Sequence, residues 1–452
     1  MSKIYSARWV LPISQPVIES GAVVIDGSNI AAVGNRHDLL ARFSGLPHED
    51  LGNAAILPGL VNTHSHLELT VMRGFLEPVE HDFFAWLRKL TVARLNMSEE
   101  DLFISAAYGA WEAARAGITC LADSSSFATQ SMRALQEAGL RGIVYQESFG
   151  PDPKLAAENV GKLRAQLDAM RAIETELVRA GVSPHAPYTV SAPQLQMIAR
   201  LAIDQTLPLM MHAAESVAER EFLVRGTGPF ADGLKARAIN WQAPGISTVR
   251  YLDEHDVLET KPLLAHCINV DENDLQLIRN AGAGIAHCPK SNAKLRHGYA
   301  PFASFVEQQI NVGLGSDSVA SNNVCDILEE ARFAVLLGRT GSAATVSAAE
   351  ALAAATGGGA RALGLAHRIG SLQPGMAADL AVVNLGDWHQ EPVRDPAASL
   401  IFSSSGRDVL LTVVDGREIY RRDCPAIHES DLQARLDQVR TKLDRVPAGM
   451  DR

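Results

Sequence analysis

Histidines that follow short apolar segments are the residues of this chain most suited to chemistry. The segment from Leu57 to Thr63 leads into His64 and His66, which form an H-x-H pair. Residues two apart on a strand point to the same side, so both imidazoles could reach one ion. Taken alone, the pair is equally compatible with two solvent-facing loop histidines. Its weight therefore depends on matching residues elsewhere in the chain.

Three further apolar segments end in residues of the same kind, and they lead to His212, His266 and Asp317. One histidine after a strand is more often structural than a ligand. Several such ends, all suited to one divalent ion, favour a metal site instead. We expect one ion, zinc or alternatively iron, held by three histidines and one carboxylate: His64, His66, His212 and Asp317.

The predicted ion needs residues that move protons. Water on a catalytic metal has a pKa of about 7 instead of about 15.7, which makes it nucleophilic. Glu215, three residues after His212, is predicted to take the water proton and pass it to the leaving group. His266 is predicted to orient the nucleophile or stabilise charge on it, and Asp317 is counted as catalytic as well as metal-binding. A solvated helix position for Glu215, and a fourth-ligand or core position for His266, are the alternatives.

Repeated β/α units are expected to position these residues. Eight apolar segments alternate with helical or mixed ones: 59–63, 118–123, 142–147, 176–183, 208–212, 262–267, 284–288 and 311–315. This series predicts an α/β fold with a TIM-type (β/α)8 barrel over residues 58–367, in which the carboxyl ends of the strands converge on one face. A doubly wound open sheet is the alternative, although no G-x-G-x-x-G follows the first segment.

The two ends of the chain carry β signals of their own. Residues 1–57 and 368–425 are expected to pair as one small composite β-sandwich, with strands near 6–10, 22–26, 30–33, 379–384 and 408–415. Residues 426–452 are expected to form a C-terminal helix and tail. Between these parts, strong helix formers at 348–356 predict a helix, which Gly357 to Gly359 should interrupt.

Charge and cysteine content exclude several classes of protein. Lys and Arg number 41 against 52 Asp and Glu, giving a net charge of −11, which argues against a nucleic-acid partner. The five cysteines include no C-x-x-C, so reduced thiols are expected. The first residues do not resemble a signal peptide, and no apolar run is long enough to span a bilayer. We expect a cytoplasmic protein without a membrane partner, and a homodimer stays open.

Six motifs together resemble the amidohydrolase superfamily, and within it the aminohydrolase group that deaminates aromatic heterocycles. They are LPGLVNTHSHLELTVMRG, SPHAPYTVS, MHAAES, LAHC, HCPKSNAKLRHG and GLGSDS. The resemblance covers nearly the whole chain, because IGSLQPGMAADLAVVNL is similar to the family's β-sandwich. It implies the same metal ligands, proton shuttle and orienting histidine as above. Binuclear members carry a bridging lysine on the fourth strand, and residues 176–188 contain none, which implies a single ion.

The order of HSHLEL and HAAES is similar to deaminases of adenosine-like nucleosides, including aminodeoxyfutalosine, S-adenosylhomocysteine and methylthioadenosine. We therefore expect hydrolytic release of ammonia from an amino-substituted ring in a small heterocyclic substrate. Three residues are predicted to contact it. His185 follows the fourth strand, Trp86 would belong to a lid, and Arg296 would bind a carboxylate. Loop, packing and surface roles are the respective alternatives.

Other functions remain as alternatives at this point. Guanine or cytosine deaminases and triazine-type chlorohydrolases share the resemblance, and a non-catalytic scaffold would keep only the fold. Glu215 favours ammonia release over chloride release, because an amine must be protonated before it departs. A scaffold is disfavoured, since each expected ligand is present.

Overall fold

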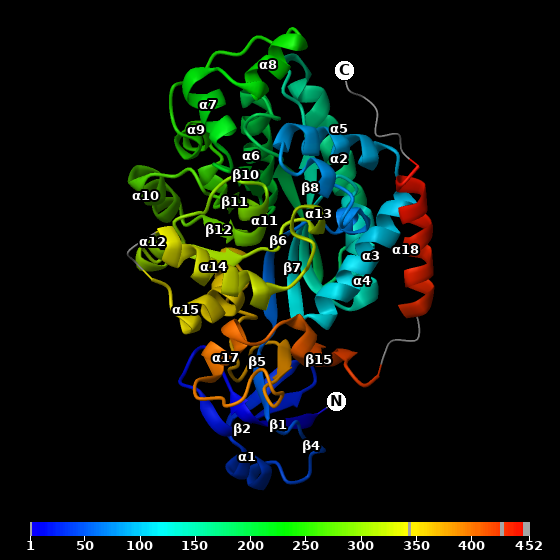
Figure 1. Cartoon of the computed structure of the whole chain (residues 1–452), viewed down its shortest axis with the longest axis vertical. Helices are drawn as coiled ribbons and strands as arrows, with labels where there is room; N and C mark the ends of the chain where they lie inside the picture. The colour runs from blue at the N-terminus through cyan, green and yellow to red at the C-terminus, as the bar shows by residue number, and fades with distance from the viewer. Residues whose placement is uncertain (1, 342–344, 425–428, 446–452) are drawn as a thin grey trace.

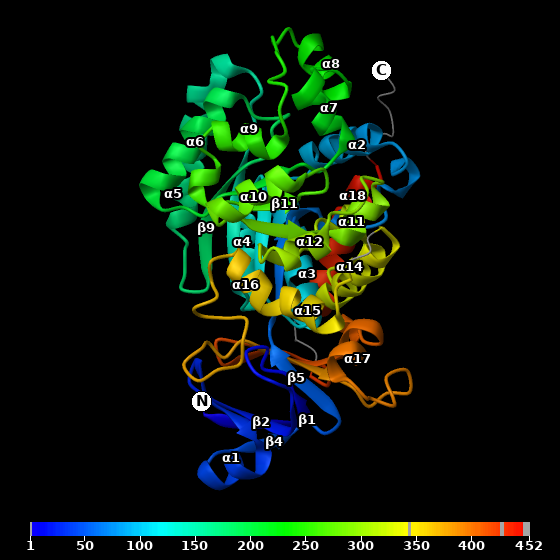
Figure 2. The same cartoon turned by 90° about the vertical axis from the view of Figure 1, so that its left-hand side faces the viewer.

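The computed structural model describes residues 2–341, 345–424 and 429–445. Helices surround a set of parallel strands, and a β-rich part lies at one end of the molecule (Figures 1 and 2). The α/β fold expected from the sequence is confirmed. Among the described residues, no helix combines the length and the apolar character needed to cross a membrane.

Eight parallel strands form two sheets of four. These strands are β6 (Leu60–Ser65), β7 (Ile118–Ser125), β8 (Arg141–Ser148), β9 (Val178–Pro184), β10 (Met210–Ala213), β11 (Leu263–His266), β12 (Gly284–His287) and β13 (Asn311–Leu314). Isolated parallel bridges join the sheets at both seams, Val182 to Leu209 and Ser65 to Asp317. The eight strands therefore follow one another around a ring, in chain order.

Helices and short 3-10 segments connect the strands and cover the ring from outside. The helices of this part are α2 (Phe83–Leu95), α3 (Glu99–Arg115), α4 (Ala128–Ala138), α5 (Ala156–Arg171), α6 (Ala192–Gln205), α7 (Val217–Arg225), α8 (Pro229–Ala236), α9 (Thr248–Glu254), α10 (Glu272–Ala281), α11 (Pro289–Lys294), α12 (Phe302–Glu307), α13 (Val319–Asn322), α14 (Ile327–Gly341), α15 (Ala348–Ala353) and α16 (Gly359–Ala362). The final helix, α18 (Glu429–Leu443), packs against α3 (Figure 1).

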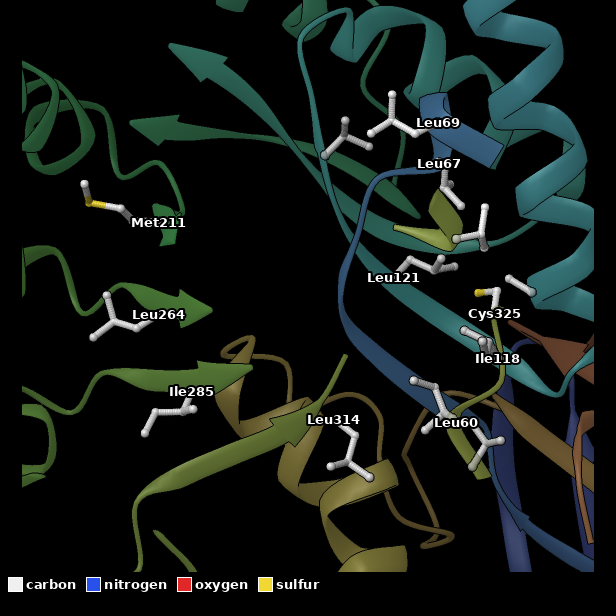
Figure 3. Close-up of a cluster of buried hydrophobic side chains, with 14 of the residues drawn as sticks. Leu60, Leu67, Leu69, Ile118, Leu121, Met211, Leu264, Ile285, Leu314 and Cys325 are labelled. Carbon is white, nitrogen blue, oxygen red and sulfur yellow. The ribbon is translucent and has the colours of Figure 1, made fainter. Parts of the chain in front are cut away.

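Side chains alternate between the two faces of the ring strands, as the pleat requires. Leu264 of β11 belongs to the large outer cluster between strands and helices, where Figure 3 also places Leu121 and Ile285. Ala265, the next residue, belongs to a separate inner cluster with Tyr145. The ring interior is thus filled by side chains away from the carboxyl ends of the strands.

Both chain ends contribute to the β-rich part. Its sheet has the order β16-β15-β14-β5-β1-β2-β3, with β4 paired to β1. The strands are β1 (Lys3–Val10), β2 (Ile18–Asp26), β3 (Asn29–Asn35), β4 (His48–Asp50), β5 (Ala54–Pro58), β14 (Leu380–Asn384), β15 (Val409–Val414) and β16 (Arg417–Arg421), accompanied by α1 (Arg36–Arg42) and α17 (Pro396–Phe402). Ile56 of β5 lies opposite Val382 of β14, so the early and late segments share one antiparallel ladder.

The glycines at 357–359 do not interrupt the helix, and that prediction was wrong. A π-helical turn, Ala354–Gly358, continues directly into α16. A Cβ atom on Gly358 would lie 2.5 Å from the Val312 carbonyl oxygen, and one on Gly359 would lie 2.9 Å from Val61 Cβ. The glycines therefore let the helical segment approach the backbone of the strand ring, which outweighs their low helix propensity.

Candidate metal centre

The carboxyl ends of four ring strands carry the candidate ligands. His64 lies in β6, His212 in β10 and His266 at the end of β11, while Asp317 follows β13. The Asp317 backbone N–H donates to the His64 carbonyl at 2.9 Å, which ties the first strand to the last. His266 and Asp317 adopt left-handed backbone conformations, with φ of 75° and 54°. Such conformations cost energy and recur at functional sites.

These side chains converge on one point. Ligand atoms of His64, His66 and Asp317 lie within 4.8 Å of one another, and so do those of His64, His212 and His266. Asp317 Oδ1 is 3.3 Å from His64 Nε2 and 3.6 Å from His66 Nε2. The structure therefore brings together the four expected ligands and His266.

Hydrogen bonding within the cluster suits a bound cation. Both ring nitrogens of the buried His64 have no hydrogen-bond partner among the described residues, and an unpaired buried polar group costs about 1–3 kcal/mol. His212 Nδ1 donates to the His185 carbonyl at 2.9 Å, and His266 Nδ1 donates to Asn292 Oδ1 at 2.8 Å. Each bond leaves Nε2 free, as hydrogen bonds to the second ring nitrogen of metal-binding histidines do. The residues present fit a divalent ion that accepts nitrogen and oxygen ligands.

The charges of the cluster also suit a cation. Burial lowers the pKa of His64 to about 3 and that of His212 below its ordinary value, so both rings are neutral, as metal ligation requires. Burial alone would raise the pKa of Asp317, but the interaction with His64, whose Nε2 lies 3.3 Å from Oδ1, outweighs burial and holds that pKa well below the usual range. Ser291 and Ser321 donate to Asp317 Oδ2 at 2.5 and 3.1 Å. Asp317 is therefore a fixed anion beside the neutral ring of His64.

Glu215 is buried beside this cluster. Its Oε1 atom lies 3.7 Å from His266 Nε2. The backbone N–H groups of Ala214 and Glu215 donate to the Glu219 carboxyl at 2.8 and 2.9 Å, and Thr248 Oγ1 donates to it at 2.7 Å. Burial raises the pKa of Glu219 to about 7. Glu219 thus holds the turn that carries Glu215 after β10.

The three predicted substrate contacts have different surroundings. The His185 ring lies 4.6 Å from the His212 ring, and its Nδ1 is 2.9 Å from Thr189 Oγ1. Trp86 of α2 is buried and stacks on Phe83 with ring centres 6.1 Å apart. Arg296 is exposed and lies outside the buried cluster. His185 is thus brought to the candidate ligands, Trp86 lies one ring away from His297, and Arg296 is at the surface.

Glu147 joins the site although the sequence reasoning did not select it. Its Oε1 is 3.9 Å from His66 Nδ1, and Ser126 Oγ donates to its Oε2 at 2.9 Å. Burial alone would raise the pKa of Glu147, but attraction to His185, His66 and Arg94 lowers it to about 2. Glu147 lies near the end of the third ring strand, so the strand-end rule applied to His212 could have found it.

His297 is the second residue that sequence reasoning missed. Its Nε2 is 3.6 Å from Glu215 Oε1, and its ring meets Phe83 edge-on with centres 4.6 Å apart. Because His297 lies in the loop after α11 (Pro289–Lys294), no strand or helix period marks it in the sequence.

Aromatic rings from separate segments lie next to the polar cluster. Phe84 of α2 and Tyr188 after β9 both contact Phe230 of α8, with ring centres 5.1 and 3.8 Å apart. Phe83 contacts His297 on one side, and Tyr188 meets His185 on the other, with ring centres 6.2 Å apart. This aromatic group, Phe83, Phe84, Tyr188 and Phe230, offers a wall suited to a planar, largely apolar ligand.

Comparison with known proteins gives consistent results. The Amidohydrolase family profile matches residues 55–419. The chain is 32% identical over 419 residues to the 5-methylthioadenosine/S-adenosylhomocysteine deaminase of Symbiobacterium thermophilum, covering 91% of this chain and 92% of the relative. It is 30% identical over 409 residues to the 5'-deoxyadenosine deaminase of Methanothermobacter thermautotrophicus, covering 89% and 90%.

Solved structures agree with this result. An adenosine deaminase from Xanthomonas campestris, solved with bound zinc, is 27% identical and superimposes with a TM-score of 0.86 over 98% of both chains. Atrazine chlorohydrolase TrzN from Arthrobacter aurescens, at 23% identity and a TM-score of 0.82, covers 98% of this chain and 100% of its own, and shares the fold. The profile match and the relatives together show that the chain belongs to the amidohydrolase family.

Proposed function

We propose that this protein is a metal-dependent deaminase that hydrolyses the exocyclic amine from an adenine-type nucleoside and releases ammonia. The observation that carries the proposal is Glu215 Oε1, 3.7 Å from His266 Nε2, next to the cluster of three histidines and Asp317. The deaminase relatives support the same reaction class, since they cover about nine-tenths of the chain. Aminodeoxyfutalosine is one member of the proposed substrate class.

His64, His66, His212 and Asp317 would hold a single ion, for which zinc is the proposed identity. When bound, such an ion supplies the means to make water nucleophilic at neutral pH. The zinc found with the Xanthomonas campestris deaminase supports this choice. Glu147, 3.9 Å from His66 Nδ1, would accept a hydrogen bond from that atom and keep Nε2 directed at the ion.

Glu215 and His266 would divide the proton chemistry. Glu215 takes a proton from water as a general base and delivers it to the departing amine as a general acid. His266 Nδ1 donates to Asn292 Oδ1 at 2.8 Å, so the Nε2 of the neutral ring stays aimed at the reacting groups, where it would accept a hydrogen bond and orient the water. Asp317, anionic beside the neutral ring of His64, would offset the charge of the ion and help orient the water.

The aromatic wall would receive the ring of the substrate. His185, next to His212, is the proposed polar contact, and Trp86 would support the wall from within α2. Arg296, being exposed, would reach only the part of a substrate that extends out of the site.

We further propose that residues 58–367 form a closed (β/α)8 barrel and that residues 1–57 and 368–425 form a composite β-sandwich. The proposed C-terminal part, 426–452, includes 426–428 and 446–452, which lie outside the described residues.

Ammonia release from a substrate panel tests the proposed function. The zinc-loaded protein is incubated with adenosine, 5'-deoxyadenosine, 5'-methylthioadenosine, S-adenosylhomocysteine, aminodeoxyfutalosine, guanine and cytosine. We expect ammonia from one or more adenine nucleosides and little from the free bases. Zinc-loaded protein that releases no ammonia from any member would contradict the proposal, and release from guanine or cytosine alone would reassign the substrate class.

A further inference from the structure

His297 occupies a fixed position at the edge of the site. Its backbone N–H donates to the Asn292 carbonyl at 2.9 Å, while the Asn292 side chain accepts from His266 Nδ1. Asn292 therefore fixes the backbone of His297 and the ring of His266, the two histidines that approach Glu215. The Phe83 ring meets the His297 ring at an interplanar angle of 84°, which restricts its rotation. The side chain is only 7% exposed.

The Nε2 atom of His297 is buried and has no hydrogen-bond partner among the described residues. This atom lies 3.6 Å from Glu215 Oε1, which carries the charge that it faces. Leaving such an atom unpaired costs about 1–3 kcal/mol, whereas a phenylalanine would pack against Phe83 without that cost. A role in packing alone does not explain a histidine at this position.

Two imidazoles thus face the same carboxylate oxygen. His266 Nε2 lies 3.7 Å and His297 Nε2 lies 3.6 Å from Glu215 Oε1. Burial lowers the pKa of His297, so its ring is neutral and carries one N–H. An anionic carboxylate can only accept, which favours the proton on Nε2. Catalytic hydrogen bonds are often long in ligand-free structures and shorten when substrate binds.

We propose that His297 is a positioning residue for Glu215, which it holds by donating Nε2–H to Oε1. With Oε1 held, Oε2 takes the proton when water loses it, and the same Oε2–H bond breaks when the proton passes to the departing amine. As the hydroxide adds, a C–O bond forms at the amine-bearing carbon and the electron pair of the ring C=N bond moves to the ring nitrogen. That pair returns when the C–N bond breaks and the protonated amine leaves as ammonia, so no oxidant or other reactant is needed. This role rests on the proposed function, because it assigns work to Glu215 within that reaction.

Two substitutions separate hydrogen bonding from packing. His297→Phe keeps an aromatic ring against Phe83 but removes the donor, and His297→Gln restores a donor of similar reach. We expect His297→Phe to lower kcat about 10- to 100-fold, a fraction of the about 10²- to 10⁴-fold that proton transfer contributes. KM, zinc content and Tm should change little, and His297→Gln should recover part of kcat.

A double-mutant cycle with Glu215→Gln decides whether His297 acts through Glu215. We expect His297→Phe to have almost no further effect once Glu215 is replaced, because the two residues would act as a unit. An equal loss in both backgrounds, or a change in KM alone, would overturn the proposal and indicate a direct substrate contact. A loss of zinc or of Tm that accounts for the lower kcat would overturn it in favour of a structural role.

Histidine-selective ¹⁵N NMR of the zinc-loaded protein tests the same contact without turnover. The His297 signal is assigned by its absence from His297→Phe. We expect the Nε2–H tautomer, with a shift that changes in Glu215→Gln. An Nδ1–H tautomer, or a signal indifferent to Glu215→Gln, would overturn the proposal. This measurement needs no substrate, so its result does not depend on the ammonia screen. A failed screen would contradict the proposed function, and the NMR result would still show whether His297 contacts Glu215.

Discussion

Buried charged side chains at one end of the strand ring are paired, whereas buried imidazoles at the other end keep unpaired nitrogens. At the end next to the β-rich part, the buried Arg141 pairs with Asp379 through two hydrogen bonds of 2.8 and 3.1 Å. At the carboxyl ends, His64 and His297 keep buried nitrogens without partners among the described residues. The backbone there is also left-handed at His266 and Asp317.

This contrast indicates that the end next to the β-rich part contributes to stability, whereas the carboxyl ends of the strands carry the residues suited to chemistry. Satisfied buried ion pairs hold two parts of the chain in register, and removing one partner strands the other charge. Unpaired nitrogens and a left-handed backbone lower the free energy of unfolding of the free protein. Ligand binding restores this stability. Substitutions at the carboxyl ends should therefore affect metal binding and turnover, and those at the opposite end should affect the free energy of unfolding.

Removing a proposed metal ligand should have the largest effect on activity. We expect His212→Ala to lose zinc and to abolish ammonia release, because the ion would lose one of its four protein ligands. Zinc per chain, measured by atomic spectrometry, checks the prediction. His37→Ala is the matched control, since the His37 side chain is 92% exposed. Full zinc occupancy in His212→Ala would break the comparison.

Replacing the proposed proton shuttle, Glu215, should lower turnover almost as much. Glu215→Gln should lower kcat about 10²- to 10⁴-fold, because the amide cannot shuttle the proton. Zinc content should stay at the wild-type level, since Glu215 is not a proposed ligand. Glu158→Gln, at an exposed position paired with Lys162, serves as control. If Glu215→Gln retains wild-type turnover, the assignment of Glu215 is wrong.

Glu147 sharpens the comparison between the two ends of the ring. It lies at the carboxyl ends but is paired, and it would affect zinc binding through its contact with His66. Glu147→Gln should weaken zinc binding about 10- to 100-fold, the usual effect of losing a hydrogen-bond partner that orients a metal-binding histidine. Competition with a zinc chelator measures this affinity. The exposed Glu176, replaced in the same way, controls for charge. Unchanged zinc affinity together with a raised KM would make Glu147 a substrate contact instead.

At the opposite end, Arg141→Met should destabilise the fold and spare the chemistry. We expect a loss of about 3–5 kcal/mol in the free energy of unfolding, because Asp379 would be buried without its partner. Denaturant unfolding measures this change, and kcat of the folded, zinc-loaded variant should match the wild type. A large drop in kcat at unchanged stability would show that the two ends are not separable.

The surface ion pairs of the β-rich part should matter least. Hydrogen bonding from Arg421 lowers the pKa of Glu49 from 4.5 to about 2. A lowered folded-state pKa stabilises the protein above pH 4.5, and this contribution is lost as the pH falls towards 2. Glu49→Gln should therefore lower Tm slightly at pH 6, and the difference should shrink at pH 3. A difference that grows on acidification would contradict this sign.

Much of this arrangement could be predicted from the sequence, because a histidine directly after a short apolar segment indicates the end of a strand. His64, His212 and His266 each follow an apolar segment, and the structure places all three at the carboxyl ends of ring strands. The convergence of these ends follows from the β/α alternation.

Other features depend on contacts that no local pattern reveals. β4 (His48–Asp50) has no apolar residue, and it pairs with β1 beside a cluster of Lys3, Glu49 and Arg421. His297 lies in a loop, where a backbone hydrogen bond to Asn292 holds it, and its side chain lies 3.6 Å from Glu215. Such positions become visible only when tertiary contacts are known.

Deamination in ¹⁸O-labelled water tests the central claim most directly. The zinc-loaded protein is given the adenine nucleoside that the panel identifies, and the product and ammonia are quantified by mass spectrometry and enzymatic assay. Metal-assisted hydrolysis through Glu215 predicts one labelled oxygen on the carbon that lost the amine, one ammonia per product, and formation of both about 10²- to 10⁴-fold more slowly in Glu215→Gln. A zinc-loaded protein that yields neither ammonia nor labelled product from any adenine-type nucleoside would contradict the account.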